Sequence, residues 1–268
     1  MTRRRGRGAP FIAVLLAFVA VVFFALPLIG LLGKVEWGSL WDNLTSQQAT
    51  DAIRLSIECS LWAMTISLVF GVPLAYVLAR VAFPGKAFVR ALVVLPMVLP
   101  PVVGGVALLL VFGRTNGVVG PWIYDTFGWQ FTFSKSGVVL AETFVAMPFL
   151  VITVEAGLRT MDRRYEDAAA TLGASRWTVF RRVTVPLIAP SLFAGAALAW
   201  ARALGEFGAT ITFAGNIQGR TQTTPLAVYL LLENQRQVAI ALSLLLLTVS
   251  ITVLVLLRDR WFGNVRSA

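Results

Sequence analysis

The polar residues best able to do chemistry lie in one stretch of an otherwise apolar chain, AWARALGEFGATITFAGNIQGRTQTTPLAVY, from Ala199 to Tyr229. Arg202 and Glu206 stand four residues apart, so they share a helix face and can form an ion pair where isolated charge is costly. Two interpretations stay open for this pair. It lines a translocation path, or it only fixes the packing of helices.

Glycines and hydroxyls flank the pair and suit the passage of a polar solute. Gly205 and Gly208 expose backbone, and Thr210 and Thr212 add hydroxyl donors. An oxyanion accepts hydrogen bonds of this kind and needs no fixed counter-charge, which would hold it too tightly. We therefore place these residues on the candidate translocation path.

Catalytic chemistry has few residues to use. The chain has no His and one cysteine, Cys59, so a disulfide within the chain and any Cys/His metal or Cys-His catalytic site are excluded. The motif FPGKAF lacks the first glycine and the Ser/Thr of a phosphate-binding loop. We expect no catalytic residue, metal or cofactor on this chain, and ATP with its Mg²⁺ would be used on another chain.

A second polar stretch, YEDAAATLGASRWTVFRRVTVP, runs from Tyr165 to Pro186. Its first half places apolar residues on one helix face, and they are Tyr165, Ala168, Ala169 and Leu172. Gly173 follows where a helix C-cap favours positive φ, and Ser175 can cap a second short helix that carries Trp177 and Phe180. Pro186 is expected to open the next membrane helix. The pattern predicts a helix, a turn and a helix at the membrane surface.

Two roles compete for this stretch. An amphipathic connector would direct its arginines to lipid headgroups and its aromatic residues into the bilayer. The alanines favour the second role, because small residues let the backbone of another protein come close.

The elements that position both stretches are membrane helices. The chain is 57% hydrophobic and 13% charged, with a mean hydropathy of +0.79. A helical span needs about 20 apolar residues. Six runs qualify: Phe11 to Leu32, Cys59 to Ala79, Ala91 to Gly113, Gly137 to Leu158, Val183 to Ala201 and Gln237 to Leu257. In lipid the backbone must satisfy its own hydrogen bonds, so we predict an all-α polytopic membrane protein with six transmembrane helices.

The charge distribution sets the topology. With the N-terminus inside, sixteen of the 23 Lys and Arg fall in inner segments, including Arg3, Arg4, Arg5, Arg7, Arg258, Arg260 and Arg266. This asymmetry follows the positive-inside rule, which predicts that both termini are cytoplasmic. Topology and membrane lipids therefore explain the net charge of +10, and nucleic acid is not needed as a partner.

The first run is read as an uncleaved helix, because it is long enough to span and no A-x-A cleavage site follows it. Pro100 and Pro101 predict a kink in the third run, and they either line the translocation path or serve packing only. The whole chain, 1–268, is expected to form a single transmembrane domain in which 159–186 is a cytoplasmic segment. A membrane enzyme would need a nucleophile, base or metal set that the chain lacks.

The segment 159–186 resembles permease subunits of binding-protein-dependent ABC importers. Their pattern is E-A-A, three residues, Gly, nine residues, I-x-L-P. Here Asp167-Ala168-Ala169 precedes Gly173 by the same spacing, and Val183-Thr184-Val185-Pro186 follows it. Asp replaces Glu, with Glu166 just before it, and Val replaces Ile and Leu. The resemblance implies a six-helix permease fold of type I importers whose coupling helices dock on an ATPase, and it assigns that role to Glu166, Asp167, Ala168, Ala169, Gly173, Ala174, Ser175, Trp177, Phe180 and Pro186.

The stretch from Ala203 to Tyr229 closely resembles molybdate and tungstate permeases, while sulfate permeases share only its Gly-Glu-(Phe/Tyr)-Gly and Ala-Gly-Asn core. The resemblance implies a homodimer in the cell membrane, two copies of an ABC ATPase and an extracytoplasmic oxyanion-binding protein. Sulfate import is the nearest alternative. An ATP-independent secondary transporter is a further one, but the inverted repeat expected of it is not found.

Overall fold

The computed structural model describes residues 10–262, with side chains described for residues 10–257. Within these residues every regular element is a helix, which confirms the predicted all-α class. The elements are α1 (Phe11–Gly33), α2 (Leu40–Thr45), α3 (Gln47–Arg80), α4 (Lys86–Val98), α5 (Pro101–Phe112), α6 (Gly120–Phe127), α7 (Lys135–Thr160), α8 (Arg164–Thr171), α9 (Arg176–Val179), the π-helical turn η1 (Phe180–Thr184), α10 (Val185–Leu204), α11 (Gly208–Phe213), α12 (Thr224–Asn234) and α13 (Arg236–Phe262). The terminal arginines Arg3, Arg4, Arg5, Arg7 and Arg266 lie outside the described residues.

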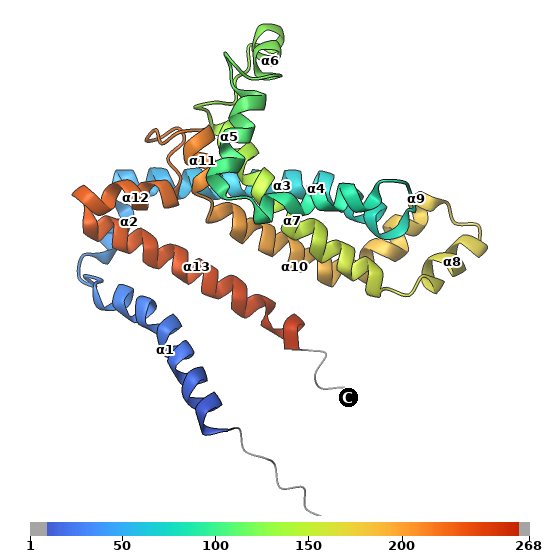
Figure 1. Cartoon of the computed structure of the whole chain (residues 1–268), viewed down its shortest axis with the longest axis horizontal. Coiled ribbons are helices and arrows are strands. Elements are labelled where there is room, and N and C mark those ends of the chain that lie inside the picture. Colours follow the sequence, from blue (N-terminus) through green and yellow to red (C-terminus); the bar gives the residue numbers. More distant parts are fainter. Residues whose placement is uncertain (1–9, 263–268) are drawn as a thin grey trace, which may run out of the picture.

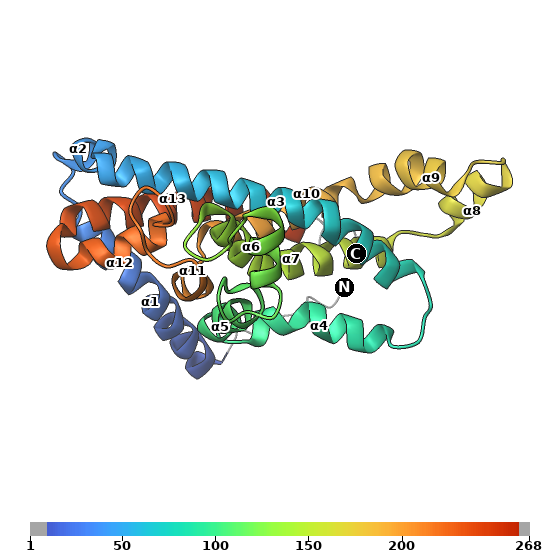
Figure 2. The same ribbon diagram turned by 90° about the horizontal axis from the view of Figure 1, so that it is seen from above.

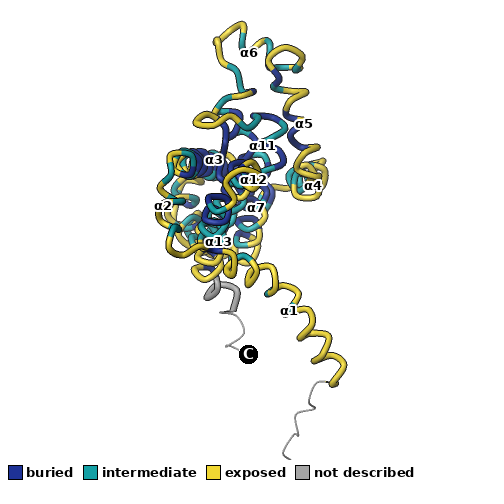
Figure 3. Tube along the Cα trace, turned by 90° about the vertical axis from the view of Figure 1, so that its left-hand side faces the viewer, coloured by how far each residue is buried: buried dark blue, intermediate teal, exposed yellow. Residues whose placement is uncertain are grey.

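A bundle of long helices forms the body of the molecule, with α3, α7, α10 and α13 side by side (Figure 1). Helix α7 is central, because it packs against both α3 and α10. The main core cluster gathers around fully buried Leu78, Leu150 and Leu158. Figure 3 shows the buried chain concentrated in this bundle, whereas α1 is exposed along nearly its whole length.

Five helical stretches of the described chain are long and apolar enough to cross a membrane, namely Phe11–Gly33, Gln47–Arg80, Lys135–Thr160, Arg176–Leu204 and Arg236–Leu257. The pair α4 and α5 passes the same test only when taken together, and it supplies the sixth span. These spans confirm a multi-pass membrane protein. Helix α3 begins at Gln47, twelve residues before the predicted span, so it is longer than a single crossing needs.

The third span is broken rather than kinked, which corrects the prediction of one continuous helix from Ala91 to Gly113. Helix α4 ends at Val98, and α5 leaves at 118° to it. Both Leu99 (ψ 135°) and Pro100 (ψ 129°) are extended, because a residue that precedes proline is forced out of the α region. The double proline therefore turns α5 away from the bundle toward α6 (Figure 1).

The two ends of the bundle carry different elements. Helices α2 and α12 lie at one end, and α8 and α9 extend from the other (Figure 2). The candidate coupling segment thus lies at the end opposite α2 and α12, where α3 and α7 also terminate.

Candidate functional site

The first helix of the coupling segment, residues 159–186, ends as the sequence predicts. Gly173 has φ +85° and lies two residues past the end of α8. The N–H of Gly173 donates to the Ala170 carbonyl at 3.0 Å, and the N–H of Ala174 donates to Ala169 at 3.2 Å. These two bonds form the Schellman arrangement, in which glycine accepts the left-handed backbone without steric cost.

Ser175 starts the second helix. Its hydroxyl accepts a hydrogen bond from the N–H of Thr178 at 3.2 Å, which satisfies a donor that the first turn of a helix leaves free. The predicted helix, turn and helix are therefore present, and the tight turn fixes the two short helices relative to each other.

The outer face of the coupling segment is not covered by the rest of the chain. Tyr165 is 58% exposed, Leu172 89% and Trp177 68%. Ala168 is exposed and Ala169 half-buried on the same helix. A stripe of small and large apolar residues on a polar helix, left open at the end of the bundle, has the character of a protein-docking surface.

Phe180 contacts the bundle. Its ring packs edge-on against Tyr76 of α3 at 5.3 Å between centroids and stacks with Trp177 at 5.6 Å. Phe180 therefore connects the coupling segment to the bundle, whereas Trp177 contributes an exposed surface.

Pro186 lies in the first turn of α10, as the sequence predicts, but no break separates this helix from the short helix before it. The chain is helical without interruption from Arg176 to Leu204, and Pro186 lies on it after the π-helical turn η1. Because proline has no N–H, the usual α-helical bond from position 186 to Arg182 cannot form. The preceding turn is wider, with the Val185 N–H bonded to the Phe180 carbonyl. The second coupling helix is thus continuous with the fifth span.

Glu166 and Asp167 occupy different environments, although the sequence assigned both to docking. The Glu166 carboxylate lies 3.1 Å from Nε of Arg80 and accepts a hydrogen bond from the Thr184 hydroxyl at 2.7 Å. The side chain of Asp167 is exposed, and no ion pair forms on it within the described residues. Of the two carboxylates, Asp167 is the one available to another protein.

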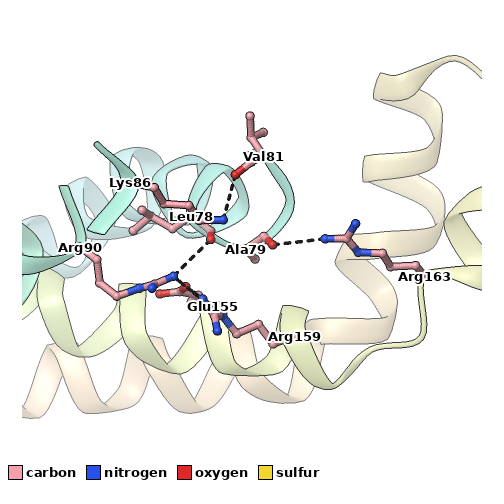
Figure 4. Close-up of polar contacts among 8 residues, drawn as sticks. All are labelled: Leu78, Ala79, Val81, Lys86, Arg90, Glu155, Arg159 and Arg163. Carbon is pink, nitrogen blue, oxygen red and sulfur yellow. Dashed lines mark hydrogen bonds and ion pairs between the residues drawn. The ribbon is translucent and has the colours of Figure 1, made fainter. Parts of the chain in front are cut away.

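A second buried carboxylate ties the same end of the bundle together. Glu155 of α7 is 6% exposed and pairs with Arg90 of α4 and with Arg159 at 2.8 Å. Figure 4 shows both guanidinium groups converging on Glu155, and Arg163 reaching the Ala79 carbonyl. Two basic side chains thus balance the charge of this buried carboxylate.

The end of α3 receives three cations, two from α4 and one from the segment between α7 and α8. Arg90 donates to the Leu78 carbonyl at 3.5 Å, Arg163 to Ala79 at 3.5 Å and Lys86 to Val81 at 2.9 Å. The last carbonyls of a helix have no partner within the helix and carry partial negative charge, so basic side chains stabilise this terminus.

In the candidate translocation path, the predicted Arg202–Glu206 pair forms. Nη2 of Arg202 lies 2.6 Å from Oε2 of Glu206, whose side chain is 1% exposed. The other oxygen, Oε1, accepts a hydrogen bond from the Ala209 N–H at 2.7 Å. Glu206 therefore holds the break between α10 and α11, with both oxygens engaged inside the chain.

Some of the predicted path residues are packed inside the protein, and others are exposed. A Cβ on Gly208 would lie 2.8 Å from the Pro101 ring, so Gly208 permits close contact between α11 and α5. The Thr212 hydroxyl donates to the Gly208 carbonyl at 2.8 Å, and Thr210 is buried. Gly205 is exposed, and Pro100 and Pro101 are exposed at the break in the third span. Of the predicted path residues, these three are the exposed ones.

The stretch after α11 folds into a loop whose residues 221–224 are buried and polar, and the sequence alone assigned these residues no individual role. Gln222 donates to Asn216 at 2.9 Å, and the N–H of Thr224 donates to Ser56 of α3 at 2.6 Å. Thr221 accepts from the N–H of Ile217 at 2.9 Å. The bond from Thr224 anchors α12 on α3, and the other two bonds hold the loop that precedes α12, so these polar residues position helices.

Sequence reasoning also missed the Arg80–Glu166–Thr184 contact and the role of Arg90. The spacing of Glu155 and Arg159, four apart on one helix, was a readable signal. Arg80 and Arg90 give no local signal, because their partners lie far along the chain.

Comparison with known proteins gives three findings. Residues 67–265 match the family described as binding-protein-dependent transport system inner membrane component. The chain is 46% identical to a molybdenum transport system permease protein of Mycobacterium bovis over 80% of both chains, and 38% identical to a sulfate transport system permease protein of Escherichia coli over 81% of this chain and 79% of that one. The fold is that of a bacterial alginate ABC transporter in complex with its periplasmic protein, with a TM-score of 0.71, 18% identity and coverage of 92% and 93%.

Proposed function

The chain belongs to the family of binding-protein-dependent transport system inner membrane components, and from this premise we propose that it is the permease subunit of an ATP-driven ABC importer for molybdate, with tungstate as a close second substrate. The similarity to molybdenum transport permeases carries the choice of substrate. The family is one of transport subunits, so the chain itself performs no covalent chemistry.

The proposed partners follow from the surfaces at the two ends of the bundle. Two copies of an ABC ATPase, which hold ATP and Mg²⁺, dock on the coupling segments of a homodimer in the cytoplasm. An extracytoplasmic oxyanion-binding protein delivers the dianion at the opposite end. The exposed stripe of Tyr165, Leu172 and Trp177 supports docking on the ATPase. The apolar surface of α1, uncovered in the single chain, supports contact with a second copy and with lipid.

Alternating access explains how the arrangement would work. Closure of the ATPases moves the coupling segment, and the uninterrupted helix from Arg176 to Leu204 passes this rigid-body movement into the membrane. The movement reaches the break at Gly205, where Arg202 is balanced by Glu206. A path that offers backbone donors beside a neutralised cation can bind a dianion and still release it.

The test is uptake by the reconstituted assembly of permease, ATPase and binding protein. We expect accumulation of labelled molybdate that requires ATP, that excess tungstate suppresses and that equimolar sulfate leaves nearly unchanged. Molybdate uptake that persists without the ATPase would indicate a secondary transporter and would overturn the proposal.

Sulfate import is the second candidate, because a sulfate permease is 38% identical to this chain. If the chain were a sulfate permease, sulfate at equal concentration would suppress molybdate uptake in the same assay. Retention of sulfate, in preference to molybdate, by the partner binding protein would decide for this alternative.

A further inference from the structure

We propose that Glu166 is a positioning residue that connects the coupling segment to α3 and to the π-helical turn, and that Asp167, one residue later, is the carboxylate that faces the ATPase. The inference rests on the proposed function and deepens it. Of the two adjacent acidic residues at the start of the coupling motif, Glu166 makes contacts within the chain and Asp167 makes a contact with the ATPase.

The two oxygens of Glu166 serve two different elements. Oε2 lies 3.1 Å from Arg80 in the last turn of α3, and Oε1 accepts from the hydroxyl of Thr184, the last residue of η1, at 2.7 Å. One carboxylate therefore joins three segments, α8, η1 and α3, of which α3 lies far from the other two in sequence.

The link is largely shielded from water. The side chains of Arg80 and Glu166 are 9% and 14% exposed, and Thr184 is fully buried. Salt screens buried pairs much less than surface pairs, and hydrogen bonds to a charged group are stronger than neutral ones. Nε and Nη2 of Arg80 are both buried and make no hydrogen bond within the described residues, so the contact with Glu166 is an ion pair, and Glu166 is the group that balances this cation.

The helix dipoles of α8 and α3 favour the negative charge of Glu166 and the positive charge of Arg80. Glu166 stands in the first turn of α8, where the helix dipole is positive, and Arg80 stands in the last turn of α3, where it is negative. Each charge is thus stabilised by its own helix end as well as by its partner.

Apolar packing does not replace the link. A hollow of ≈ 650 Å³ lies between the coupling segment and α3, lined by residues that include Tyr76, Arg80, Glu166 and Trp177. Two further contacts across it are the Tyr76–Phe180 ring contact and the longer bond of 3.5 Å from Arg163 to the Ala79 carbonyl, the second of which is shown in Figure 4. Movement of α8 therefore reaches α3 chiefly through the Arg80–Glu166 pair.

The hydrogen bond from Thr184 to Glu166 connects α8 to the π-helical turn η1. A π turn is a local departure from α-helical geometry that often lies at functional sites. Here it joins the second coupling helix to the fifth span, and Glu166 holds its last residue. With the link intact, α8, η1 and the end of α3 move as one body.

The experiment compares Glu166→Gln with Asp167→Asn, two isosteric changes on adjacent residues. In the assembly with the ATPase and the binding protein, two quantities are measured: the amount of ATPase that copurifies, and the molybdate moved per ATP hydrolysed. For Glu166→Gln we expect normal copurification and about tenfold less molybdate per ATP, the factor that one charge-assisted hydrogen bond can supply. For Asp167→Asn we expect reduced copurification and a normal ratio in the assemblies that form.

Hydrogen exchange in the permease alone supplies a readout that does not depend on transport. Amides of residues 164–184 should exchange faster in Glu166→Gln than in the wild type and be unchanged in Asp167→Asn. This result separates the link from the proposed function, since it stands even if the wild-type assembly moves no molybdate.

Thr184→Val replaces the hydroxyl with a methyl group. It tests the link independently if Glu166→Gln lowers the yield of folded protein. It should also raise exchange in α8 and lower the molybdate moved per ATP. Copurification lost in Glu166→Gln as in Asp167→Asn, or a wild-type transport ratio together with wild-type exchange in Glu166→Gln, would overturn the proposal.

Discussion

The guanidinium of Arg202 lies 2.6 Å from the carboxylate of Glu206, one turn along the chain, and the pair closes the break between α10 and α11. The second oxygen of Glu206 caps the N–H of Ala209. The sequence presents this charge pair as a candidate for transport. In the structure the pair also stabilises the junction between α10 and α11.

Neutralising either member of this pair should destabilise the protein. Glu206→Gln leaves the Arg202 charge unbalanced, and we expect a loss of about 1 to 3 kcal/mol in the free energy of unfolding. Thermal unfolding of Glu206→Gln, Arg202→Gln and the double variant forms a cycle. The double variant should be less destabilised than the sum of the single changes, by at least about 0.5 kcal/mol. Strict additivity would show that the two charges do not interact.

Close packing of α5 on α11 depends on Gly105. A Cβ at this position would lie 2.7 Å from the Ala209 carbonyl oxygen and 2.8 Å from Cβ of Thr212. Since backbone cannot yield as a flexible side chain does, Gly105→Ala should lower the stability by about 1 to 3 kcal/mol. Gly30→Ala on the exposed helix α1 is the matched control, because nothing lies within 4 Å of its added Cβ. Equal thermal midpoints for both variants would contradict the packing argument.

The turn of the coupling segment can be tested at Gly173. Its φ of +85° and open surroundings mean that Gly173→Asp adds backbone strain and a charge on the docking side. We expect the ATPase that copurifies with the permease to fall by about tenfold or more. Membrane insertion should remain intact.

Gly85→Asp controls for backbone strain alone. Gly85 has φ +79°, is equally open and lies in the loop before α4. This variant should lose some stability yet retain the ATPase. Normal uptake in Gly173→Asp, or the same loss of ATPase in both variants, would count against docking at the turn.

Glu155 should prove important for stability at the end of the bundle that carries α8 and α9. Glu155→Gln leaves Arg90 and Arg159 without their shared carboxylate, and Glu155 itself is 6% exposed. We expect a destabilisation of about 1 to 3 kcal/mol, because the change breaks bonds to a charged group that is buried. Thermal unfolding of the purified permease measures it, and an unchanged midpoint would contradict the assignment.

Local cues in the sequence predicted much of the coupling segment. Gly173 after an apolar helix face, Ser175 before a second one, and the i,i+4 spacing of Arg202 and Glu206 are all short-range signals, and each matches the structure. The same holds for the membrane spans, because hydropathy is summed over a single helix.

Features that depend on distant partners could not be predicted. The double proline indicated a kink, but not the 118° angle between α4 and α5, nor the packing of α5 on the sequence-distant α11. Glu166 and Asp167 look equivalent in sequence, and only the positions of Arg80 and Thr184 separate them. Likewise, Gly208 appeared as open backbone on a path, whereas Pro101 covers it.

The central claim is that the coupling segment lies in the cytoplasm and docks on an ATPase, and a single cysteine tests it most directly. Cys59 is the only cysteine and is buried, so Leu172→Cys in a Cys59→Ser background places one reactive thiol on a residue that is 89% exposed. A membrane-impermeant thiol reagent should label this cysteine in inside-out vesicles and not in right-side-out ones, and bound ATPase should protect it. Labelling from the outer side, or full labelling with the ATPase bound, would contradict the account.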